Sequence, residues 1–162
     1  MTNAHVQKIV IVGIGNVLCR DEGVGVHVIE ELKEYNLPYN VEVHDCGTGG
    51  LDVLEFLEGS DKAIIVDAVI GEMESGEIYH VRLDEVDARD EKMKMLSLHE
   101  LDLVKAIEIG KRAYKIPENI FVIGIEPKNV ELGMDLTAEV RQAIPRVIQD
   151  IFEIIELDPS KP

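Results

Sequence analysis

Short apolar runs alternate with longer amphipathic segments along the chain. The apolar runs are rich in Val and Ile, which is typical of strands buried inside a sheet. They predict strands at residues 8–13, 41–45, 63–69, 76–83 and 120–124. The longer segments repeat apolar residues at helical spacing. They predict helices at residues 24–35, 51–58, 98–114 and 137–155.

The alternation of strands and helices predicts an α/β fold. We expect a single three-layer domain, with a mostly parallel, twisted sheet of about five strands and helices on both faces. The domain spans residues 1–162 with its core at about 8–155, because no repeat or linker divides the chain. Thr137 is expected to be the N-cap of the last helix, and Pro145 should kink or split that helix. The charge-dense segment 84–95 is expected to form a loop.

A glycine-rich loop over residues 13–25 follows the first predicted strand. A dinucleotide-binding loop has a third glycine three residues after its second, but here that position is Leu18. Asp21 and Glu22 lie where such a loop offers bare N–H groups to an anion. Two carboxylates at this place would repel a phosphate and attract a cation. The loop therefore favours a metal or a positively charged partner over a dinucleotide.

Polar residues lie at the carboxyl ends of the predicted strands, where parallel sheets bind ligands. Glu22 is in the loop after the first strand, and Asp45 ends the second. Asp67 lies within the apolar third strand, where an uncompensated carboxylate carries a desolvation penalty. His99 opens the helix beyond the fourth strand and could reach the same edge of the sheet.

Each of these side chains has an ordinary structural explanation when it is taken alone. Asp67 could cap a neighbouring turn, Glu22 could interact with a helix dipole, and His99 could be a surface histidine behind the capping box of Ser97 and Glu100. Together, Glu22, Asp67 and His99 form a set of oxygen and nitrogen ligands that suits divalent metals such as zinc or nickel. Three protein ligands leave positions open for water or for groups of a substrate.

Charge and composition exclude several classes of partner. The formal net charge of −16 at pH 7 makes nucleic acid and anionic membranes unfavourable partners. No apolar run approaches the ~18 residues of a membrane span, and the first residues lack the pattern of a signal peptide. The two cysteines, Cys19 and Cys46, form no C-x-x-C pair and are expected to be free thiols in a reducing compartment. We therefore expect a cytoplasmic protein.

Six motifs occur in order over roughly residues 8–155. They are G-x-G-N-x-L-x-x-D-E-G-x-G at 13–25, D-C-G-T-x-G at 45–50, I-I-V-D-A at 64–68, S-x-H-x-L at 97–101, G-I-E-P at 124–127 and G-x-x-L-T at 133–137. With these motifs the chain resembles the hydrogenase maturation endopeptidases, which process the large subunit of nickel–iron hydrogenases. Cys46 stands where glycine is frequent in that family, and Cys19 lies inside the first loop. Neither cysteine replaces a metal-contacting residue of the family.

The resemblance implies an endopeptidase that removes a C-terminal extension from the large-subunit precursor after nickel has been inserted. Glu22, Asp67 and His99 match the family's metal-contacting residues, and we expect the same three to take part in catalysis. The resemblance also implies that no cofactor is tightly bound. The metal is the substrate's Ni²⁺, for which Zn²⁺ or Cd²⁺ could substitute in vitro. The implied partner is the hydrogenase large-subunit precursor, with no nucleic acid and no membrane insertion.

The residues indicate no covalent nucleophile, because the chain shows no sign of a serine or cysteine triad and has no G-x-S-x-G elbow. It also has no H-E-x-x-H zinc helix. We therefore expect a metal-polarised carbonyl or a metal-activated water to carry the hydrolysis. Asp45, Gly47 and Thr48 are candidates for holding the substrate backbone, or they simply form a glycine-rich turn. Two other functions stay open. One is a metallopeptidase that holds its own zinc, and the other is a non-enzymatic nickel-binding assembly factor.

Overall fold

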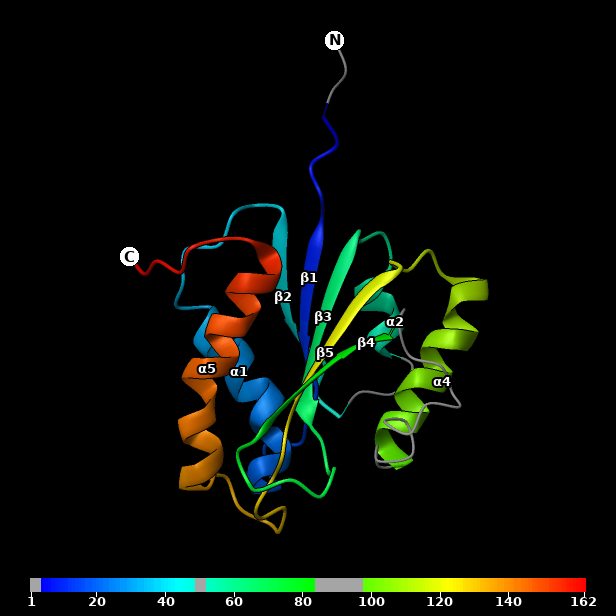
Figure 1. The fold of residues 1–162 in the computed structure, drawn as a ribbon. Helices are drawn as coiled ribbons and strands as arrows, with labels where there is room; N and C mark the ends of the chain where they lie inside the picture. Colours follow the sequence, from blue (N-terminus) through cyan, green and yellow to red (C-terminus); the bar gives the residue numbers. More distant parts are fainter. Residues whose placement is uncertain (1–3, 49–51, 84–97) are drawn as a thin grey trace.

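The computed structural model describes residues 4–48, 52–83 and 98–162, with the backbone alone at 98–102. Its centre is a five-stranded sheet in the order β2-β1-β3-β5-β4 (Figure 1). The strands are β1 (Ile9–Gly13), β2 (Val41–Asp45), β3 (Lys62–Ala68), β4 (Ile78–Arg82) and β5 (Asn119–Ile125). Neighbouring strands pair in parallel except at one edge, where β4 runs antiparallel to β5. The mostly parallel sheet predicted from the sequence is confirmed.

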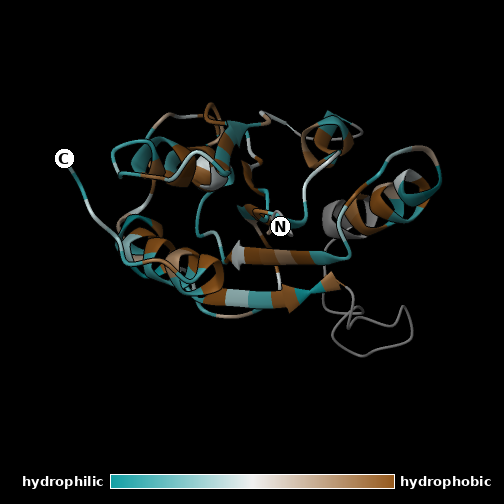
Figure 2. Cartoon of the chain, turned by 90° about the horizontal axis from the view of Figure 1, so that it is seen from above, coloured by the Kyte–Doolittle hydropathy of each residue, from teal (hydrophilic) through white to brown (hydrophobic). Residues whose placement is uncertain are grey.

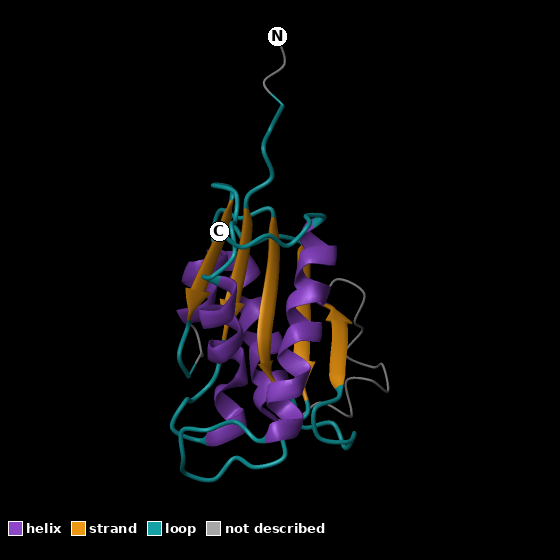
Figure 3. Cartoon of the chain, turned by 90° about the vertical axis from the view of Figure 1, so that its left-hand side faces the viewer, coloured by secondary structure: helices purple, strands orange, loops and turns teal. Residues whose placement is uncertain are grey.

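Helices cover both faces of this sheet. They are the 3-10 helix η1 (Arg20–Gly23) and the α-helices α1 (Val24–Leu32), α2 (Asp52–Leu57), α4 (Leu98–Ala113) and α5 (Ala138–Ile155). Helices α1 and α5 lie on one face, and α2 and α4 lie on the other (Figure 1). Figure 3, viewed from the side of α1 and α5, shows these helices in front of the sheet and roughly along its strands. The predicted three-layer arrangement is therefore confirmed.

Strand β3 shows how one short sequence supplies both layers of the core. Successive side chains of a strand point to opposite faces of the sheet. Ile64 and Val66 join the apolar cluster beneath α1 and α5, whereas Ala63 and Ile65 join the cluster beneath α2 and α4. All four are completely buried. Figure 2 shows hydrophobic and hydrophilic residues on the same helices, as expected for helices with one face toward a sheet.

The start of α1 lies directly against the sheet. A Cβ atom at Gly25 would be 2.3 Å from the carbonyl oxygens of Ile14 and Val66, which is too close for any side chain. Glycine is therefore required in this first turn for a steric reason. The close approach holds the loop after β1 against the end of β3, where the candidate site lies.

Two details of the helices differ from the expectation. Helix α1 ends at Leu32, and residues 33–35 form a turn. Pro145 does not split the last helix, because α5 continues unbroken through it. The proline is exposed, so the Arg141 carbonyl that loses its helical N–H partner can bind water instead. The segment 84–95 lies outside the described residues. No helix in the described part of the chain has the length and apolar character that a bilayer span requires.

Candidate functional site

The carboxyl ends of β1, β2, β3 and β5 meet at one edge of the sheet, at the bottom of Figure 1. Backbone hydrogen bonds join the loops that leave β1 and β2. The Gly15 N–H donates to the Gly47 carbonyl at 2.6 Å, and the Cys46 N–H donates to the Gly13 carbonyl at 2.9 Å. The loops after β1 and β2 are therefore joined at this edge.

Asp67 is the next-to-last residue of β3 and lies at this edge. By the alternation of β3, its side chain belongs to the face that α2 and α4 cover. The residue is 2% exposed, and the Ala68 N–H donates to its Oδ1 at 2.8 Å. Its partner in the neighbouring strand is Gly124 of β5. The structure thus places a buried carboxylate at the carboxyl end of a central strand.

Glu22 lies in η1, between the loop after β1 and the start of α1. Helix η1 packs against β3, so the elements that carry Glu22 and Asp67 are in contact. The side chain of Glu22 is partly exposed. Glu22 is therefore in partial contact with solvent, in contrast to the preceding residue described below.

His99 lies in the first turn of α4, as its sequence predicts. Leu103, one turn farther along α4, lines a small apolar cavity together with Val69 and Gly124, and Gly124 is the strand partner of Asp67. The backbone at His99 is therefore at the same edge, and on the same face, as Asp67. The capping residue Ser97 lies outside the described residues. The described side chains do not include that of His99. Among the side chains that are described, no three His, Cys, Asp or Glu residues are grouped so that they could hold a metal ion.

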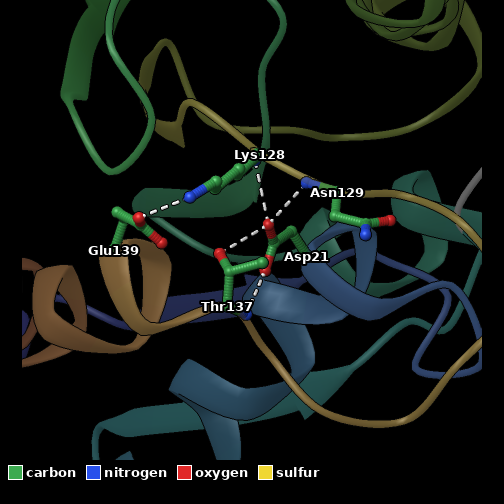
Figure 4. A network of polar contacts seen from close by, with 5 residues as sticks. All are labelled: Asp21, Lys128, Asn129, Thr137 and Glu139. Atoms are coloured by element: carbon green, nitrogen blue, oxygen red, sulfur yellow. Dashed lines mark hydrogen bonds and ion pairs between the residues drawn. The ribbon is translucent and has the colours of Figure 1, made fainter.

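Asp21 is completely buried beside Glu22 and is surrounded by donors (Figure 4). The N–H groups of Lys128 and Asn129 both donate to its Oδ2 at 2.9 Å. The Thr137 N–H donates to Oδ1 and the Thr137 hydroxyl donates to Oδ2, each at 2.8 Å. The expectation that Asp21 helps to attract an external cation is therefore wrong. Its carboxylate is saturated by the protein itself, and we call these contacts the Asp21 clamp.

The clamp also sets the ionisation of Asp21. Burial by itself would raise its pKa, but hydrogen bonds from the N–H groups of Asn129, Thr137 and Lys128, and from the Thr137 hydroxyl, outweigh burial and hold the pKa below its usual value. Asp21 is thus a fixed anion that ties η1 to the loop before α5. Thr137 occupies the predicted N-cap position, but its hydroxyl makes no cap hydrogen bond and donates to Asp21.

The loop after β2 contains the residues predicted to hold substrate backbone. Asp45 Oδ1 accepts a hydrogen bond from the Gly47 N–H at 2.7 Å, and Gly47 has φ +57°, a conformation that favours glycine. These contacts form a glycine-rich turn, which was the alternative interpretation of Asp45, Gly47 and Thr48. Thr48 is exposed beside it, and substrate binding by this loop stays a prediction.

The two cysteines are free and half-buried. Burial, with smaller contributions from Asp52 and Asp45, raises the pKa of Cys46 to about 11. The Cys46 sulfur is therefore a neutral thiol near pH 7, which is a poor metal ligand. This agrees with the expectation of ordinary thiols.

Two further groups of residues were not assigned from the sequence. Buried Glu126, just after β5, accepts hydrogen bonds from the Gly71 N–H at 2.8 Å and the Tyr79 hydroxyl at 3.1 Å. It holds the loop after β3 to the end of β5. On the face of the sheet that α1 and α5 cover, a cavity of about 510 Å³ lies between β4 and α5, and the residues that line it include His80 and Asp150. The sequence signals for Glu126 were its place directly after an apolar strand and its place in the G-I-E-P motif at 124–127.

Comparisons with known proteins agree with this geometry. A family model described as hydrogenase maturation protease matches residues 26–154. The chain is 37% identical over 145 residues to the hydrogenase expression/formation protein HupD of Bradyrhizobium diazoefficiens, covering 88% of this chain and 75% of that protein. It is 30% identical over 147 residues to the hydrogenase 2 maturation protease of Escherichia coli (strain K12), covering 90% of this chain and 88% of that protein.

A solved structure shares the fold. The hydrogenase maturating endopeptidase HybD from E. coli superposes with a TM-score of 0.78 at 26% sequence identity, and the match covers 93% of each chain. The matched range spans most of the chain and includes positions 67 and 99, whereas Glu22 lies outside it. The chain therefore belongs to the hydrogenase maturation protease family, and it is a peptidase.

Proposed function

We propose that this peptidase removes the C-terminal extension of a nickel–iron hydrogenase large-subunit precursor after nickel insertion. In this proposal Glu22, Asp67 and His99 recognise the nickel that the substrate carries. The observation that supports it most directly is the position of Asp67, a buried carboxylate at the open edge of the sheet. It lies beside the element that carries Glu22 and on the face that α4 covers.

The chemistry of the donor set supports recognition of a metal that arrives with the substrate. Two carboxylates balance the charge of a divalent ion, and one imidazole adds a neutral nitrogen ligand. Three ligands leave positions that groups of the precursor fill, so the protein alone binds nickel weakly and the complex binds it more tightly. The substrate's nickel then polarises the scissile carbonyl or lowers the pKa of a water. No side-chain nucleophile is required.

Other parts of the proposal rest on the neighbouring loop and on the thiols. The turn at Asp45 and Gly47 is hydrogen-bonded to the loop after β1, so a substrate backbone that crosses the edge passes beside Thr48. The free thiols of Cys19 and Cys46 fit a reducing compartment such as the cytoplasm.

Replacing Glu22 by Gln tests whether the metal used in cleavage arrives with the substrate or is held by the protein itself. The purified wild-type protein should contain little metal, should cut nickel-loaded precursor and should leave nickel-free precursor intact. Glu22→Gln removes one anionic ligand, so cleavage of the loaded precursor should fall at least about tenfold. Cleavage is measured by the mass of the product, and metal is measured by elemental analysis of the purified protein.

Glu30→Gln is the matched control, because Glu30 is an exposed carboxylate on α1 whose partner is Lys33. It removes the same charge far from the edge and should cleave at the wild-type rate. Stoichiometric, tightly bound zinc in the active protein, or equal cleavage of nickel-free precursor, would establish the autonomous zinc peptidase instead. Binding of the precursor without cleavage would establish the assembly factor.

Replacing His99 by Ala should abolish processing with little loss of stability, because the sequence assigns the helix cap to Ser97 and Glu100. The melting temperature should change by no more than about 2–4 °C, the shift produced by roughly 1 kcal/mol in a chain of this size. His5→Ala, which removes an exposed imidazole paired with Asp61, is the control. A large fall in melting temperature with activity retained would show that His99 is a structural residue.

A further inference from the structure

Exposed apolar side chains gather at the same edge as the candidate site. Among the described residues, ten large hydrophobic side chains are exposed, and six of them lie in the loops after β1, β3 and β5. These six are Leu18, Ile70, Met73, Val130, Leu132 and Met134. Such a concentration marks an interaction surface more often than single scattered hydrophobic residues do.

Backbone hydrogen bonds hold Leu18 beside the segment that carries Leu132 and Met134. The Gly133 N–H donates to the Leu18 carbonyl and the Arg20 N–H donates to the Gly133 carbonyl, each at 2.9 Å. The exposed fractions are 55% for Leu18, 83% for Leu132 and 69% for Met134. We call the surface formed by Leu18, Leu132 and Met134 the apolar rim.

The packing of the loop does not account for these side chains. Leu136 from the same loop is buried in the core, and the Asp21 clamp fixes the loop through Lys128, Asn129 and Thr137. The loop is therefore anchored without Leu132 and Met134. A rigid loop that presents unused apolar side chains is pre-organised to bind a partner, because little ordering remains to be done on association.

We propose that the apolar rim docks the folded body of the precursor, on an apolar protein surface next to the segment that is cut. This inference rests on the proposed function. Its occupant follows from continuity, because Leu18 lies in the loop that leads directly into η1, the short helix of Glu22, and both are hydrogen-bonded to Gly133 through Leu18 and Arg20. A protein substrate that brings its scissile bond to Glu22 therefore has its folded body next to the rim.

The charges around the rim define the partner further. Glu131 and Asp135 are exposed and flank the segment from Leu132 to Met134, whereas Arg20 lies beside Gly133. The matching surface is therefore apolar, with basic groups opposite the two carboxylates. A small nickel complex or a short peptide would not bury all three side chains. The carboxylates of Glu22 and Asp67 thus bind the metal, and the apolar rim binds the protein that carries it.

The double substitution Leu132→Ser with Met134→Ser tests the proposal on full-length, nickel-loaded precursor. It should raise KM about tenfold, the effect expected for losing a central apolar contact, and leave kcat unchanged because the rim does not touch the reacting atoms. The affinity for precursor, measured by titration calorimetry, should fall by the same factor. Leu132→Met keeps an apolar side chain and should retain the wild-type KM.

Tyr39→Ser is the matched control, because Tyr39 is 86% exposed and lies at the opposite edge, beside the start of β1. It should leave both KM and affinity unchanged, and melting curves should show that all variants are folded. An unchanged KM and affinity in the double variant would overturn the docking proposal while the proposed function stands. If the wild type binds precursor through the rim but does not cut it, the proposed function fails and the docking stands.

Self-association is the remaining alternative. If the wild type is a dimer and the double variant is a monomer with unchanged affinity for precursor, the rim joins two copies of this chain and the docking proposal is overturned. If the wild type neither binds nor cuts the precursor, both proposals fail together.

Discussion

Asp67→Asn should abolish cleavage of nickel-loaded precursor while the protein stays folded. Asn has nearly the shape of Asp but carries no charge and is a much weaker metal ligand. Asp67 is buried at the carboxyl end of β3, and its Oδ1 already accepts the Ala68 N–H, a contact that an Asn oxygen can keep. We therefore expect the rate to fall at least about a hundredfold, measured as product mass against time.

Asp150→Asn is the matched control for the loss of a buried charge. Asp150 belongs to α5 and is buried on the face of the sheet opposite the side chain of Asp67. It accepts hydrogen bonds from His80 at 2.8 Å and Arg146 at 3.0 Å. Its replacement should lower the melting temperature and leave cleavage near the wild-type rate. Wild-type cleavage by Asp67→Asn would show that the Asp67 carboxylate does not contact the metal.

Asp21→Ala should cause a large loss of stability. The change leaves the part-buried N–H groups of Lys128, Asn129 and Thr137 without their acceptor. Hydrogen bonds to a charged group contribute about 1.5–3 kcal/mol each and are not additive, so we expect a loss of roughly 3–4 kcal/mol in the free energy of unfolding. For a chain of this size this corresponds to a fall in melting temperature on the order of 10 °C.

Glu139→Ala is the control, because Glu139 forms an exposed ion pair with Lys128 at 2.6 Å (Figure 4). Such a pair contributes about 0–1 kcal/mol, so its loss should shift the melting temperature little. Equal shifts in the two variants would contradict the assignment of the clamp. Activity should fall in Asp21→Ala as well, because Glu22 is the next residue on the same short helix.

The pH dependence of stability separates the charge of Asp21 from its shape. The pKa of Asp21 is lowered in the folded protein, so the clamp contributes its full stability above the unfolded pKa of about 3.9. This contribution is lost as pH falls through the lower, folded pKa. In Asp21→Asn, the free energy of unfolding should decrease less steeply than in the wild type as the pH is lowered below about 4. If the free energy of unfolding decreases equally steeply below pH 4 in wild type and variant, another carboxylate is responsible for the loss of stability in acid.

Adjacent carboxylates have opposite environments in this protein. Asp21 is buried and saturated with donors, whereas Glu22 is partly exposed at the edge. Their shared position at the start of a helix suggested one common role as a cation-binding pair. Which carboxylate is internal depends on the direction of each side chain and on the 126–137 loop, which is more than a hundred residues away along the chain.

The sequence alone determined the layered architecture. Runs of Val and Ile predicted the central strands, since buried strands need apolar side chains on both faces. Helical spacing predicted α4 and α5, and the rule for ligand sites in parallel sheets predicted the edge where Asp67 lies. These features depend on local periodicity, which a single sequence contains in full.

Only the tertiary structure decided which polar groups are satisfied internally. The Asp21 clamp, the contacts of Glu126 with Gly71 and Tyr79, and the alignment of Leu18 with Gly133 all join segments far apart in sequence. Pro145 likewise stays within α5 because it is exposed, so water can satisfy the carbonyl that loses its partner. Burial and hydrogen-bond partners arise from long-range packing, and no local pattern of residues encodes them.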